Sequence, residues 1–255
     1  MANLTRVKDI LIALKLYRPA RYLNDRLRNP GRLRDFRQNR EFYSQFVGPG
    51  DLCFDLGANI GRKAEALLDL GARVVSVEPQ PHCVRELKAL CGHNPRFSCV
   101  PKAVGNEPGT ARLHVSSVDT ESSLKPEWGE HWNSSIEVEV TTIDQLIREF
   151  GLPRFCKIDV EGFELEVLRG LSRTIRFLSF EYNLRFPDRP RECLEELDRF
   201  GIKRLNVSFE EEMRLASDVW WDRDSFLRWF GELPARASGA WYGDIIVDCE
   251  EGAEA

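Results

Sequence analysis

The chain has 255 residues, of which 42% are hydrophobic and 30% charged, so one globular domain with an appendage suits it better than two domains. Its net charge of −5 is unevenly distributed, because residues 1–50 carry 11 Lys and Arg against 4 Asp and Glu. The arginines are scattered among apolar residues without an aromatic platform, which argues against a nucleic-acid-binding module.

Cysteine and histidine residues show no metal-binding pattern. None of the seven cysteines belongs to a CxxC pair, several fall inside apolar runs, and the four histidines are dispersed along the chain. We therefore expect reduced, mostly packed thiols, no zinc site and a cytoplasmic protein.

Residues 1–47 are expected to form a basic helical extension. Leu4, Val7, Leu11 and Leu14 recur at helical spacing, which predicts an amphipathic helix, yet the segment is too short and too charged to span a bilayer. It does not have the pattern of a signal peptide either. Docking of its apolar face on the rest of the protein is the first expectation. Contact with a membrane surface or with a carrier protein is the alternative.

The main domain is expected over residues 48–249, followed by a short acidic tail at 250–255. Strands and helices alternate in its first half. Apolar runs, glycine stops and proline breaks predict strand 51–56, helix 62–70, strand 72–78, helix 83–91 and strand 97–104. Strands separated by helices at this spacing favour right-handed βαβ units in an open parallel sheet.

The second half continues this order after an excursion from the sheet. Residues 110–118 and 136–142 alternate like half-exposed strands. The later elements are helix 143–150, strand 155–159, helix 163–168, strand 175–181, helix 191–200, and strands 203–208 and 244–248. The predicted fold is α/β: a Rossmann-like, mostly parallel sheet of seven strands, with helices on both faces and an antiparallel terminal hairpin.

A glycine-bearing turn at residues 55–61 is the strongest local signal for a ligand site. Gly57 permits a tight turn, and Gly61 lets the next helix start close to the strand, where free N–H groups favour an anion. Glu78 ends the second strand, where a carboxylate can accept hydrogen bonds from both ribose hydroxyls of a nucleoside. The turn lacks the GxGxxG spacing of a dinucleotide fold, so NAD is the weaker choice of cofactor.

Several separate segments resemble the FkbM-type methyltransferases, a family of class I S-adenosylmethionine-dependent enzymes. The similarity covers roughly residues 41–248, and the DVEG block is the feature that points to this family. The segments are FDLGANIG at 54–61, VEP at 77–79, TTID at 141–144, KIDVEGFELEVLRG at 157–170 and GDIIV at 243–247.

The resemblance implies that the cofactor is S-adenosylmethionine, bound at the carboxyl ends of the first strands. Residues 55–61 would hold its methionine portion, Glu78 its ribose, and the residues near Ala103 its adenine. The cofactor-binding residues expected on this basis are Asp55, Gly57, Ala58, Asn59, Gly61, Glu78, Pro79, Ala103, Val104 and Asp159.

Acidic residues follow the fourth and fifth core strands, at the edge where a methyl group would be presented. Asp159 is the first candidate for a catalytic base, Glu181 the second, and Glu161 is a further catalytic candidate. Structural alternatives remain: Asp159 caps a helix or contacts the cofactor amine, Glu161 is solvated, or Glu181 pairs with an arginine. Asp159 and Glu161 also leave a divalent metal open, although two carboxylates do not specify one.

Two further features of the sequence concern the binding of the substrate. Arg62 and Lys63 follow the glycine turn where related sequences carry small or aromatic residues. We expect these two side chains to alter the entrance of the cofactor site or to recruit an acidic substrate. The loop containing Ser122, Ser123, Trp128, His131 and Trp132 is expected to cover the acceptor.

O-methylation of a small-molecule or glycan hydroxyl, on a sugar or another secondary metabolite, is the leading functional hypothesis. The alternatives are a nicotinamide-dependent oxidoreductase and a non-catalytic nucleoside-binding protein.

Overall fold

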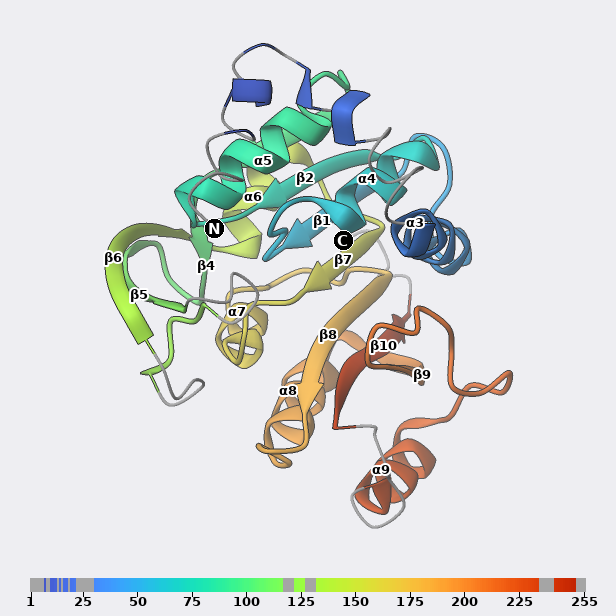
Figure 1. The fold of residues 1–255 in the computed structure, drawn as a ribbon. Coiled ribbons are helices and arrows are strands. Elements are labelled where there is room, and N and C mark those ends of the chain that lie inside the picture. Colours follow the sequence, from blue (N-terminus) through green and yellow to red (C-terminus); the bar gives the residue numbers. More distant parts are fainter. Residues whose placement is uncertain are drawn as a thin grey trace.

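The structure is a computed structural model in which residues 7, 10–12, 14, 16, 17, 19–21, 30–116, 122–126, 132–233 and 241–250 are described (Figure 1). These residues build a large seven-stranded sheet and a small three-stranded sheet. None of the described helices is long and apolar enough to cross a membrane.

The large sheet has the strand order β3-β2-β1-β7-β8-β10-β9. Its first five strands run parallel, whereas β10 lies antiparallel between β8 and β9. This arrangement confirms the predicted Rossmann-like fold with an antiparallel terminal hairpin. The strands are β1 (Leu52–Leu56), β2 (Arg73–Val77), β3 (Phe97–Val100), β7 (Phe155–Ile158), β8 (Phe177–Asn183), β9 (Ile202–Phe209) and β10 (Tyr242–Cys249).

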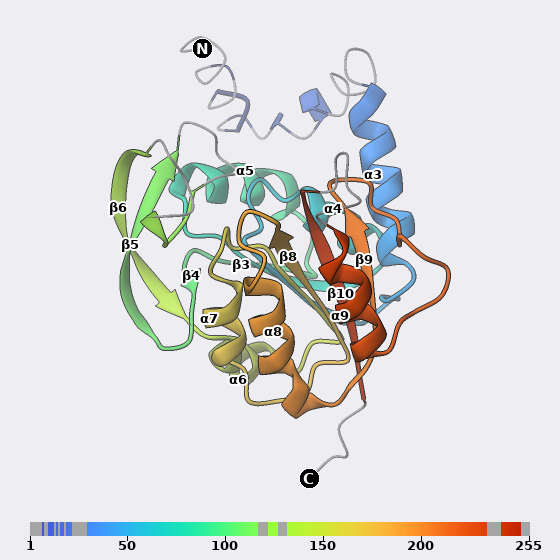
Figure 2. The same cartoon turned by 90° about the horizontal axis from the view of Figure 1, so that it is seen from below.

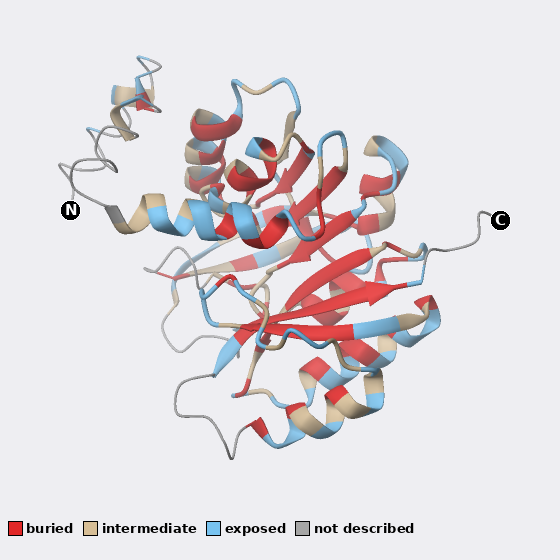
Figure 3. Ribbon diagram, turned by 90° about the vertical axis from the view of Figure 1, so that its right-hand side faces the viewer, coloured by how far each residue is buried: buried red, intermediate tan, exposed pale blue. Residues whose placement is uncertain are grey.

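Helices cover both faces of this sheet, as Figure 2 shows. One layer holds α3 (Pro30–Tyr43), α4 (Arg62–Asp69) and α5 (Pro81–Cys91). The other layer holds α6 (Ile143–Phe150), α7 (Glu164–Arg169), α8 (Arg189–Leu197) and α9 (Arg223–Gly231). Successive residues of β1 point to opposite faces, so Phe54 packs in the second layer and Cys53 in the first. The central strands are buried on both faces, which explains their continuous apolar sequences (Figure 3).

The predicted strand 97–104 is wrong, because the structure divides it into two strands in different sheets. β3 ends at Val100, and β4 (Ala103–Val104) pairs with β6 (Trp132–Thr141) instead. Pro101 separates the two strands; it has no N–H group to donate to a ladder and interrupts the pairing. β5 (Gly109–Ser116) completes the small sheet as the antiparallel partner of β6, which is the expected excursion from the main sheet.

The N-terminal extension touches the domain through aromatic residues. Tyr17 is buried, and its hydroxyl donates a hydrogen bond of 2.9 Å to Glu86 on α5. Tyr43, at the end of α3, packs edge-on against Phe155 of β7. The predicted docking of the amphipathic face is wrong for Val7 and Leu14, which are 55% and 61% exposed, because the contact with the domain is made further along the chain. Leu4 lies outside the described residues.

Candidate functional site

The strand register places the candidate residues along one edge of the large sheet. Leu56 pairs with Val77 of β2 and with Ile158 of β7, and Ile158 pairs with Phe180 of β8. The residue that follows each of these strand positions is Gly57, Glu78, Asp159 or Glu181. Because four parallel strands reach this edge in register, residues distant in sequence lie in one row at their carboxyl ends, where ligands gather in open α/β sheets.

Gly57 stands where the turn after β1 passes closest to the neighbouring strand. Its φ is +80°, and a Cβ atom there would lie 1.7 Å from the backbone oxygen of Asp159. Its N–H donates to the carbonyl of Val77 at 2.9 Å. Gly61 is similarly confined, since a Cβ would lie 2.5 Å from Leu87 Cδ1. Both glycines are therefore required by the packing of the turn, whatever ligand it holds.

Glu78 is a buried carboxylate held by two backbone groups. Its Oε2 accepts a hydrogen bond from Asn59 N and its Oε1 one from Gln80 N, each at 2.8 Å. Burial raises the pKa of Glu78 to about 7, although the two backbone bonds act in the opposite direction. Each carboxylate oxygen keeps a second lone pair, so the group can still accept hydrogen bonds from a ligand.

A cavity of about 440 Å³ opens beside this row, a volume within the range of small-ligand pockets. Nine of the cofactor-binding and catalytic candidates line it: Gly57, Asn59, Glu78, Pro79, Ala103, Val104, Asp159, Glu161 and Glu181. The wall also contains residues that sequence reasoning had not placed there, among them Gln80, Lys102, Leu113, Glu211 and Tyr242. A different cavity, of about 650 Å³, lies among α3, α4 and α5, away from the strand ends.

Three of the expected cofactor residues do not line the cavity. Asp55 is fully buried behind the turn, where Ser76 Oγ approaches its carboxylate at 3.4 Å. Burial raises the pKa of Asp55 to about 6, although the charge of Lys157 opposes the rise. Ala58 is buried with its N–H bonded to Val77, and Gly61 packs on α5. These three residues therefore pack within the turn and do not line the cavity.

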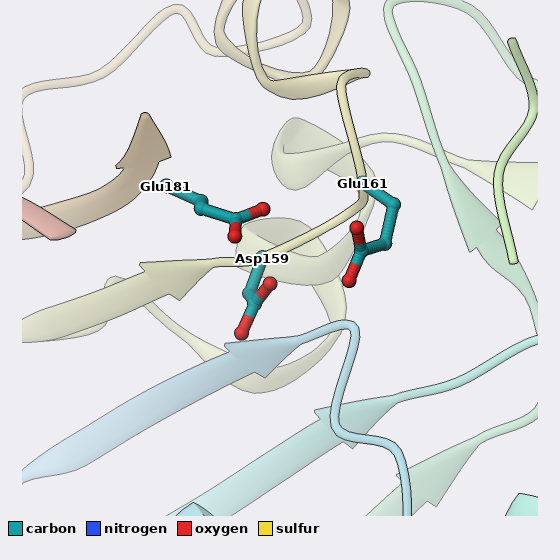
Figure 4. Close-up of side chains that lie close together, drawn as sticks. All are labelled: Asp159, Glu161 and Glu181. Carbon is teal, nitrogen blue, oxygen red and sulfur yellow. The ribbon is translucent and has the colours of Figure 1, made fainter. Parts of the chain in front are cut away.

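Asp159, Glu161 and Glu181 converge within the cavity lining and form what we call the carboxylate cluster (Figure 4). One oxygen from each residue lies within 4.8 Å of the others. Burial, followed by the charges of Glu161 and Asp159, raises the pKa of Glu181 well above its usual value. Oε2 of Glu181 is buried and has no hydrogen-bond partner among the described residues. No arginine contact of Glu181 appears among the described ion pairs.

Lys157 is a buried cation behind the cluster that sequence reasoning had not assigned to the site. Its Nζ lies 3.0 Å from Asp159 Oδ2 and 3.1 Å from Asp244 Oδ1. Burial alone would lower the pKa of Lys157, but the two carboxylates hold it well above its usual value. A lysine inside the apolar run FCKI was the signal that could have revealed this role, since buried lysines are rarely unpaired.

Glu164 lies next to the cluster, but its carboxylate is bonded to backbone N–H groups and is not part of the cluster. Its Oε1 accepts hydrogen bonds from Val160 N at 3.2 Å and from Gly162 N at 3.1 Å. Burial raises the pKa of Glu164 to about 7, with the backbone bonds opposing the rise. The carboxylate thereby fixes the turn that carries Glu161, a residue held at a φ of +53°.

Charged and polar side chains surround the cavity mouth. Lys63 Nζ lies 2.8 Å from Oε2 of Glu211, a residue of the cavity wall, but Lys63 itself does not line the cavity. Arg62 lines the separate cavity of about 650 Å³, so its expected place at the cofactor site is wrong. Ser122 lines the cavity, and Ser123 Oγ donates to the backbone oxygen of Glu161. Trp132 instead bonds to the carbonyl of Pro126 through its indole nitrogen. Trp128 and His131 lie outside the described residues.

A sheet of this order, with a glycine turn after β1 and a buried acidic residue after β2, is the arrangement of class I S-adenosylmethionine-dependent methyltransferases. Within that class, the chain belongs to the FkbM methyltransferase family, because its residues 55–216 match the methyltransferase FkbM domain.

Individual proteins resemble the chain more distantly. The hexuronic acid methyltransferase AglP of Haloferax volcanii is 27% identical over 164 residues, which cover 58% of this chain and 63% of AglP. A TehB-like methyltransferase from Corynebacterium glutamicum aligns with a TM-score of 0.42 and 12% identity over 84% of this chain and 88% of its own. A putative RNA methyltransferase from Pyrococcus horikoshii aligns with a TM-score of 0.46 and 11% identity, covering 86% and 82%.

Proposed function

We propose that the protein transfers a methyl group from S-adenosylmethionine to a hydroxyl oxygen of a sugar or a related small molecule. The observation that carries this proposal is a single cavity lined by two sets of residues. Gly57, Asn59 and Glu78, which we call the first wall, line it together with the carboxylate cluster, which we call the second wall. A nucleoside-type cofactor and a hydroxyl acceptor would meet in this cavity.

The residues of the first wall fit the cofactor. Both oxygens of Glu78 have a free lone pair for the two ribose hydroxyls, and Asn59 N fixes the carboxylate in place. Ala103 and Val104 offer apolar surface for the adenine ring, beside Pro79. S-adenosylmethionine supplies the methyl group when the acceptor oxygen bonds to the methyl carbon, and the carbon–sulfur bond breaks with its electron pair remaining on sulfur.

The second wall supplies the proton acceptor. Asp159 is paired with Lys157, which fixes its orientation and stabilises its negative charge. Glu181 has an oxygen without a described partner and faces the same space. We therefore assign the acceptance of the hydroxyl proton to Glu181 and the orientation of the acceptor to Asp159. A positioned base of this kind contributes about 10²–10⁴-fold to a rate.

Two observations support a sugar hydroxyl as the acceptor. Carboxylates accept hydrogen bonds from hydroxyl groups, and three of them line the cavity. The relative AglP is named as a hexuronic acid methyltransferase, although this chain spans only 63% of its length.

The test combines calorimetry with a screen of acceptors. Wild-type protein should bind S-adenosylhomocysteine and not NAD, and should methylate a member of a panel of monosaccharides, uronic acids and small alcohols, as detected by mass spectrometry. Glu181→Gln should lower turnover about 10²-fold or more while leaving S-adenosylhomocysteine affinity within about threefold. Binding of NAD alone would reject the methyltransferase. A larger turnover loss in Asp159→Asn than in Glu181→Gln would return the base role to Asp159.

A further inference from the structure

The carboxylate cluster brings three carboxyl groups together at the end of the central strands. Asp159 and Glu161 come from the turn after β7, whereas Glu181 comes from β8, and Figure 4 shows their carboxyl groups directed at a common space. One oxygen from each of the three carboxyl groups lies within 4.8 Å of the other two. Oxygens that ligate one ion at about 2.0–2.6 Å lie at most roughly 4–5 Å apart, so this spacing suits a single shared cation.

Lys157 is a cation shared between the cluster and another carboxylate. It contacts Asp159, but it also contacts Asp244, so one ammonium group serves two carboxylates. Glu161 and Glu181 place two further carboxyl groups close to Asp159. Like charges at this separation repel strongly where water is scarce, which favours the binding of a positive ion between them.

A second observation, independent of the clustering, concerns the hydrogen bonds of Glu181. The two buried glutamates near the cavity, Glu78 and Glu164, each accept two backbone N–H bonds. Glu181 is half-buried as a residue, but its Oε2 is buried without a described partner and its carboxyl group points at the cluster. A buried carboxylate oxygen without a partner costs about 1–3 kcal/mol or more, and a ligand at this position removes that cost.

We propose that Asp159, Glu161 and Glu181 bind one hard divalent cation of the Mg²⁺ type. The three ligands are carboxylate oxygens, the donors that Mg²⁺ and Mn²⁺ prefer, and no cysteine or histidine is among them. Since all three residues line the cavity, the remaining coordination positions of the ion face the space assigned to the acceptor.

The use of the ion in catalysis rests on the function proposed above. A hydroxyl coordinated to a divalent cation loses its proton more readily than a free one, so the ion assists deprotonation of the acceptor. An ion with several open positions also favours an acceptor with oxygens on adjacent carbon atoms, as in the vicinal hydroxyls of a sugar. Chelating acceptors are therefore expected to be methylated faster than simple alcohols.

The binding test uses Mn²⁺ as the probe and requires neither cofactor nor acceptor. Protein freed of metal with a chelator is titrated with Mn²⁺, and free Mn²⁺ is measured by electron paramagnetic resonance. Wild type should bind one ion per chain in competition with Mg²⁺. Glu161→Gln and Glu181→Gln should each weaken binding at least about tenfold. Glu137→Gln, on the exposed face of β6, is the matched control and should bind as wild type does.

The results separate the metal site from the proposed reaction. S-adenosylhomocysteine binding by every variant shows that it is folded. No Mn²⁺ binding by wild type, or equal binding by the cluster variants and the control, overturns the metal site even if methyl transfer proceeds in the presence of a chelator. Mn²⁺ binding without methylation of any acceptor leaves the site standing and rejects the reaction.

Discussion

Lys157 Nζ lies 3.1 Å from Asp244 Oδ1, although 87 residues separate them in the chain. The lysine comes from β7 and the aspartate from β10, and β8 runs between these two strands. Their contact therefore crosses the sheet above the intervening strand. It also places a cation beside Asp159, so the site depends on a strand that contributes little to the cavity itself.

Replacing Lys157 by methionine is expected to destabilise the protein by about 3–5 kcal/mol, because Asp159 and Asp244 would be left close together without their cation. Urea denaturation at pH 7 measures the change. The double variant Lys157→Met with Asp244→Asn should recover part of the stability, since it removes one of the two uncompensated charges. A loss below about 1 kcal/mol in the single variant would show that the buried ion pairs contribute little.

Glu78→Gln is expected to weaken S-adenosylhomocysteine binding by about 10- to 100-fold, since hydrogen bonds to a charged acceptor contribute about 1.5–3 kcal/mol. Isothermal calorimetry gives the affinity. Glu107→Gln, on an exposed loop, is the matched control and should bind as wild type does. Unchanged affinity in Glu78→Gln would place the ribose elsewhere.

The pH dependence of cofactor binding should follow the same carboxyl group. Burial raises the pKa of Glu78 to about 7 in the ligand-free protein, and the ribose hydroxyls require its charged form as acceptor. Affinity should therefore be greatest above pH 7 and decrease as the pH falls through that value. Calorimetry from pH 5.5 to 8.5 should show this decrease in wild type and a flatter profile in Glu78→Gln. Parallel profiles in both proteins would assign the titration to another group.

Glu164 also has a raised pKa, and here the raised pKa affects the stability of the ligand-free protein, which should decrease as the pH rises. A carboxyl group whose folded-state pKa exceeds its unfolded value binds more protons when folded, so its contribution to stability decreases as the pH rises. For Glu164 this decrease should occur between about pH 4.5 and 7. Urea denaturation of wild type and Glu164→Gln should show the difference between them changing in this window, to the disadvantage of wild type at the higher pH. A difference independent of pH would mean that Glu164 has an ordinary pKa.

Gly57→Ala is expected to destabilise the protein by more than about 2 kcal/mol and to abolish measurable cofactor binding. The added Cβ would meet the backbone oxygen of Asp159 at 1.7 Å, and the φ of +80° disfavours any side chain. Gly109→Ala is the control, because a Cβ there meets nothing within 4 Å. Its stability should stay within about 0.5 kcal/mol of wild type. Equal behaviour of the two variants in thermal denaturation would contradict the close approach at Gly57.

Local signals explain which elements could be predicted from the sequence. The helix predicted at 143–150 is α6 with the same bounds, because Thr142 caps its start and Gly151, with a φ of 103°, ends it. The split of the third strand was missed because the apolar pattern continues past Pro101, while the partner of Ala103 is Val140, far along the chain.

The site residues that lie at the ends of strands could be predicted from the sequence. Glu78 and Asp159 each follow a recognisable buried strand and Glu181 lies near the end of another, so their common edge could be inferred from a parallel sheet. The pairing of Lys157 with Asp244 could not, because it depends on where the final strand inserts into the sheet. Side-chain direction was also unavailable to the sequence: Glu164 turns toward backbone N–H groups, whereas Glu161 faces the cavity.

The insertion of β10 between β8 and β9 affects the order in which a ribosome-bound chain can mature. Residues up to Glu181 emerge first, including the glycine turn and the whole carboxylate cluster, yet Lys157 meets Asp244 only after residue 244 has left the exit tunnel. Until then β8 and β9 lack the strand that joins them. A nascent chain released before that point would retain an unpaired sheet edge, and such edges bind chaperones or other chains. Closure of the sheet is thus coupled to a strand that is synthesised after both of its neighbours.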